Sequence, residues 1–191
     1  MRKQFSIAVC TASLFIALPV FAQGNNSDHS GHDNDGKSAA HRQDAPHGFG
    51  SRANIVLSTP EQSAAVATAL TSVRSQLRSG SFRASPGATI STSAQSNLYG
   101  VIDSDDAKSP AATALSAKLV TAGSKASPIV PDLVSGFGAL RSQPAVLPSV
   151  VSRFNDFTNA ASPGFITNPP AEYLAMRAML AQLTTAAANA K

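Results

Sequence analysis

The chain has 191 residues, of which only 14% are charged, and its formal net charge at pH 7 is +4. A charge this small gives no electrostatic reason to expect binding to nucleic acid or to anionic lipid. The single cysteine, Cys10, lies in the N-terminal segment. Thiol chemistry and disulfides are therefore excluded from the rest of the chain.

The first 22 residues have the pattern of a secretory signal peptide. Arg2 and Lys3 form a positive region, and an apolar run follows over residues 5–18. The β-branched Val20 and the small Ala22 occupy the positions expected before a cleavage site. We predict cleavage after Ala22 and a periplasmic or secreted location, with no membrane span in the remaining chain. An uncleaved anchor is the alternative, although the apolar run is short for one.

Residues 23–54 are predicted to form a disordered arm. The segment is rich in Gly, Asn, Ser, Asp and His, and its one aromatic residue is Phe49. Such a segment buries too little apolar surface to offset the entropy lost on ordering. From residue 55 onward Ala, Val, Leu and Ser dominate. We therefore predict a separate helical domain over residues 55–191.

The first predicted helix of this domain has a clear beginning and end. Thr59 is a suitable N-cap, Pro60 suits the first helical position, and Gln62 completes a capping box. Gly80 is expected to end the helix. Its apolar stripe recurs at helical spacing: Val66, Leu70, Val73 and Leu77.

Residues 81–102 lack a clear period and are predicted to form a long loop, with residues 98–102 docking as a short turn or helix. A β-strand over residues 88–93 is the alternative, although no partner strand is evident.

Four further helices are predicted, each with a proline near its start, at residues 110, 128, 144 and 169. Gly123 is expected to end the first of these helices, and Val120 is expected on the inner face of that helix. Asn168 is expected to cap the last helix. Further inward-facing residues are expected to be Leu115, Leu119, Val130, Leu133, Val134, Phe137, Leu140, Leu147, Val150, Val151, Phe154, Phe157, Tyr173, Met176, Leu180 and Leu183. The predicted fold is all-α, a small bundle of about five helices.

The predicted helical domain contains no histidine, which argues against an enzyme. A site with a histidine base or a histidine-ligated metal cannot be built from residues 55–191, and phosphate-binding glycine motifs are absent from the sequence. Asp103, Asp105 and Asp106 form the one acidic cluster. It is either a carboxylate or cation site or, as we favour, a solvated helix N-terminus. Arg153 and Asp156 are three residues apart and are expected to form a surface pair.

All four histidines lie within the arm, among several aspartates. The spacing His29-x-x-His32 places two imidazoles close enough to share one metal ion, and imidazole suits Zn, Cu and Ni. The candidate ligands are His29, His32, His41, His47, Asp28, Asp33 and Asp35. The stretch fails as a calcium loop, because Arg42 stands where the final glutamate is required.

Two alternatives compete with metal binding by the arm. The arm is expected either to be a soluble spacer, which its composition favours, or to sense pH through its histidines. The expected function is that of an exported, non-enzymatic accessory or binding protein, with an envelope protein as partner and with loose divalent-metal binding through the arm. The alternative is a structural envelope or extracellular interaction module in which the arm is a passive spacer.

Overall fold

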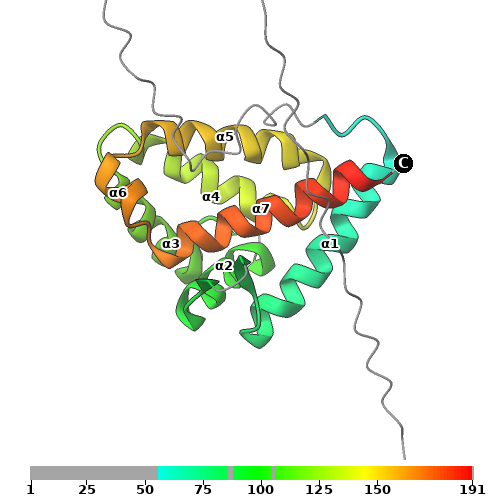
Figure 1. Ribbon diagram of the computed structural model, residues 1–191, viewed down its shortest axis with the longest axis horizontal. Helices are drawn as coiled ribbons and strands as arrows, with labels where there is room; N and C mark the ends of the chain where they lie inside the picture. Colours follow the sequence, from blue (N-terminus) through cyan, green and yellow to red (C-terminus); the bar gives the residue numbers. More distant parts are fainter. Residues whose placement is uncertain (1–55, 86–87, 105, 191) are drawn as a thin grey trace, which may run out of the picture. The chain divides into compact units, whose positions relative to one another are not determined.

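The computed structural model describes residues 56–85, 88–104 and 106–190. These residues form seven α-helices and one short antiparallel hairpin, so the described part of the chain is all-α, as predicted. None of its helices is long and apolar enough to cross a membrane. The elements (Figure 1) are α1 (Pro60–Ser79), β1 (Arg83–Ser85), β2 (Ala88–Thr89), α2 (Thr92–Ser104), α3 (Pro110–Leu119), α4 (Val130–Ala139), α5 (Leu147–Ala160), α6 (Pro163–Thr167) and α7 (Ala171–Asn189).

Polar caps followed by proline set the starts of several helices. The Thr59 hydroxyl accepts the backbone N–H of Gln62, and the Gln62 side chain accepts the backbone N–H of Thr59, both at 3.3 Å. Ser109 caps α3 in a similar way, ahead of Pro110. Gly80 follows α1 with a φ of 71°, a conformation that glycine adopts without steric cost. These are the boundaries that the sequence predicted.

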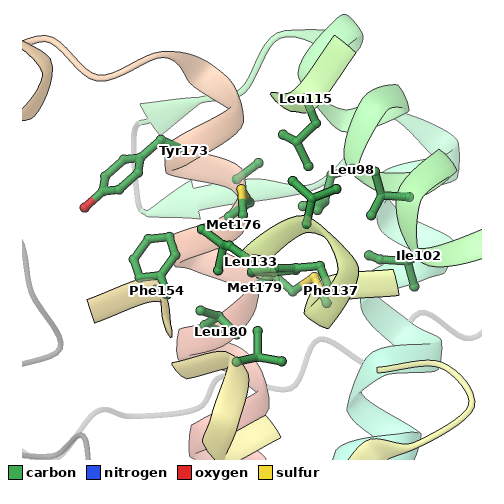
Figure 2. Packing of buried hydrophobic residues seen from close by; sticks show 14 of the residues in the cluster. Leu98, Ile102, Leu115, Leu133, Phe137, Phe154, Tyr173, Met176, Met179 and Leu180 are labelled. Atoms are coloured by element: carbon green, nitrogen blue, oxygen red, sulfur yellow. The ribbon is translucent and has the colours of Figure 1, made fainter. Parts of the chain in front are cut away.

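Helix α7 is the central element of the described fold. It contacts α1, α2, α3, α5 and β1 (Figure 1). Figure 2 shows Met176 and Met179 of α7 among side chains that include Leu98 of α2 and Phe154 of α5, and all four are fully buried. A helix that is buried on several sides is typical of a protein interior. The sequence predicted a single stripe on this helix and missed the burial of Met179.

The segment predicted as a long loop is folded differently. β1 and β2 form a hairpin in which Arg83 pairs with Thr89. The following residues form α2, so the long loop was wrong for most of the segment, whereas the short helix expected over residues 98–102 lies within α2. The strand considered over residues 88–93 is present only at Ala88–Thr89, with β1 as its partner. Five residues of α2 are buried, at helical spacing: Ala94, Gln95, Leu98, Val101 and Ile102. Small and polar residues lie between them and weaken the apolar pattern. Packing against α1, α3, α4 and α7 stabilises this helix more than its intrinsic propensity does.

Three details near the later helices also correct the prediction. The short helix α6 was missed, and Ser162 caps it by accepting the backbone N–H of Phe165 at 3.4 Å. Asn168 follows α6 and does not cap the last helix, because Pro170 occupies the N-cap position of α7. Val120 was expected to face inward, but it is 44% exposed where α3 gives way to a 3-10 turn.

Candidate functional site

The seven residues predicted to bind a metal lie outside the residues that the structure describes: Asp28, His29, His32, Asp33, Asp35, His41 and His47. Metal binding therefore stays a prediction from the sequence. Among the described residues, no group of three or more His, Cys, Asp or Glu side chains could hold a metal ion. The described helices carry other polar features: a charged cluster at the end of α2, a groove between α4 and α5, and several buried polar side chains.

Asp103, in the last turn of α2, is the centre of the charged cluster. Its carboxylate pairs with Arg74 of α1 and lies 3.5 Å from Nη1 of Arg141, which follows α4. The same Nη1 donates to the backbone carbonyl of Asp103 at 2.5 Å, so it satisfies an acceptor that a helix leaves free at its C-terminus. The two cations also offset the unfavourable position of a carboxylate at the negative end of a helix.

The cluster corrects the prediction for the acidic residues after α2. Asp103 and Asp106 do not form a carboxylate pair in the structure, because Asp103 pairs with arginines. Asp106 accepts the backbone N–H of Lys108 at 2.8 Å in the turn before α3. The interpretation as a helix N-terminus is wrong for Asp103, which lies in the last turn of α2, whereas Asp106 lies in the exposed turn that precedes the N-cap of α3. Asp105 lies outside the described residues.

Replacing Arg141 with alanine is expected to lower the free energy of unfolding by about 1 kcal/mol, since it removes a helix cap and a partly exposed ion pair. Urea denaturation at low salt measures the change. Arg153→Ala is a matched control, because Arg153 Nη1 pairs with Asp132 Oδ2 at 2.6 Å but caps no helix. We expect that control to cost less than about 0.5 kcal/mol. Equal losses in the two variants would contradict a capping role for Arg141.

An open groove of about 250 Å³ runs between α4 and α5. Arg153 of α5 pairs across it with Asp132 of α4, so the predicted pair with Asp156 is replaced by one between two helices. A Cβ atom added at Gly136 would lie 3.1 Å from Cγ2 of Val150. An added methyl group would therefore require Val150 to shift by a few tenths of an ångström, which shows that α4 and α5 pack closely at this point.

Gln95 is a buried polar residue for which the sequence analysis assigned no role. Its Oε1 accepts the backbone N–H of Phe82 at 3.0 Å. Its Nε2 donates to the carbonyls of Ile90 at 2.9 Å and Gly80 at 3.2 Å. One amide thus satisfies backbone groups on both sides of the β1–β2 hairpin and ties the hairpin to α2. The available signal was a glutamine at an inward-facing helical position between Ala94 and Leu98.

Glu172 is a buried carboxylate, only 5% exposed, in the first turn of α7. Asn97 of α2 donates to its Oε1 at 3.5 Å. The positive end of α7 also favours a negative charge at this position.

Tyr173 packs against three phenylalanines near the start of α7. Its ring centroid lies 5.1 Å from that of Phe154, 6.3 Å from that of Phe157 and 5.4 Å from that of Phe165. Thr158 donates its hydroxyl proton to the Phe154 carbonyl at 2.8 Å, so the Tyr173 hydroxyl, 3.2 Å away, is the donor to Thr158.

Burial raises the pKa of Tyr173 above its ordinary value of 10.0, against smaller opposing effects of the Thr158 hydrogen bond and the Arg177 charge. The unfolded chain therefore loses this proton at lower pH than the folded chain does. Stability from this group is present below about pH 10 and is lost as the pH rises further. We expect Tyr173→Phe to reduce the alkaline loss of stability measured in urea at pH 9 to 11. An unchanged pH dependence would contradict this assignment.

Comparisons with known proteins add no assignment. No protein-family model matches the chain, and no match was found among curated proteins or among solved structures. The proposed function therefore depends on the residues of this chain alone.

Proposed function

We propose that the protein is an exported, non-enzymatic binding protein whose N-terminal arm, residues 23–54, binds a divalent metal ion loosely. The observation that carries this proposal is the confinement of all four histidines to residues 29–47, with Asp33, Asp35 and Asp44 among them. The same proposal includes a signal peptide over residues 1–22 and disorder of the arm. It also includes a bundle-like helical domain that contacts an envelope partner.

The chemistry of the arm favours a borderline transition metal over calcium. His29 and His32 supply two imidazoles, the ligands that Zn, Cu and Ni prefer, and His41 and His47 can complete a four-ligand set. Asp28 is next to His29 and can add a carboxylate oxygen. Because protons compete with the metal for imidazole, the affinity should fall as the pH is lowered.

In this proposal the helical domain takes no part in metal binding. Its buried cluster extends from Val66 to Ala187 and contains no histidine or cysteine. A metal held by the arm would bind the folded and the unfolded chain about equally. Such a ligand does not stabilise the fold, because only preferential binding to the folded state shifts the unfolding equilibrium.

A titration with Zn²⁺ tests the proposal. The chain from Gln23 to Lys191, prepared without a His tag, is compared by isothermal titration calorimetry with a variant that lacks residues 24–48. We expect the deletion to abolish Zn²⁺ binding while circular dichroism shows unchanged helix content and unfolding temperature. Equal stoichiometry in both proteins would contradict the proposal. Absence of binding in the undeleted chain would favour the alternative of a structural interaction module with a passive spacer.

A further inference from the structure

We draw no further inference here: the strongest candidate, the open groove of about 400 Å³ that the C-terminal half of α7 forms beside Ala84 of β1, is lined by uncharged side chains, and nothing in the structure shows what covers it.

Discussion

Replacing Gln95 with leucine is expected to lower the free energy of unfolding by about 3–5 kcal/mol. Leucine is similar in size but cannot replace the bonds to Phe82, Gly80 and Ile90. A buried backbone group left without a partner costs about 1–3 kcal/mol, and the buried Phe82 N–H and Ile90 carbonyl lose theirs together with the part-buried Gly80 carbonyl. Because the total stability of a domain is about 5–15 kcal/mol, this single change removes a large part of it.

Urea denaturation followed by circular dichroism measures the Gln95→Leu effect. Gln182→Leu is the matched control, because Gln182 is an exposed glutamine on α7. We expect the control to change stability by less than about 0.5 kcal/mol. A loss below about 1 kcal/mol in Gln95→Leu would show that the buried amide does not hold the hairpin to α2.

Replacing Gly100 with alanine is expected to lower the free energy of unfolding by about 1–2 kcal/mol, less than Gln95→Leu does. A Cβ atom at this position would lie 2.5 Å from the Cβ of Ala111, so α2 and α3 would have to move apart. Overpacking of this kind costs about 1–3 kcal/mol, and the better helix propensity of alanine offsets up to about 1 kcal/mol of that cost.

A double-mutant cycle isolates this contact. Ala111→Gly removes the opposing methyl group, so the double variant Gly100→Ala, Ala111→Gly should recover stability relative to the sum of the single changes. Gly164→Ala is the control, because nothing lies within 4 Å of an added Cβ there. Additive effects of the two single changes would contradict direct contact between α2 and α3 at this point.

The helices with strong local signals could be predicted from the sequence. At α1, Thr59 and Gln62 cap each other across three residues at one end, and at the other end the Gly80 N–H bonds to the carbonyls of Gln76 and Leu77, so short-range physics is sufficient at each end. The buried stripes of α4 and α5 were also predicted, because large aliphatic and aromatic residues mark their inner faces. In these helices the local propensity agrees with the final packing.

The features missed by the sequence analysis depend on contacts between distant residues. The inner face of α2 begins with the small Ala94 and the polar Gln95, so the first half of this helix shows no apolar stripe in the sequence. Arg141 and Asp103 are 38 residues apart, and no local pattern indicates that one caps the helix of the other. The charged partner of Arg153 likewise lies on another helix. The candidate metal ligands were predicted from composition and spacing alone, and their geometry lies outside the described residues.

The most direct test of metal binding by the arm compares two variants with matched spacing. His29→Asn with His32→Asn removes the central imidazole pair, whereas Ser27→Ala with Ser30→Ala changes two neighbours at the same separation. In calorimetric titrations with Zn²⁺ at pH 7.5, we predict that the histidine variant binds at least about 10-fold more weakly, since even supporting groups around a metal contribute 10–100-fold. The serine variant should bind as the unmodified chain does. Equal affinity of the histidine variant and the unmodified chain would contradict the assignment of His29 and His32 as metal ligands.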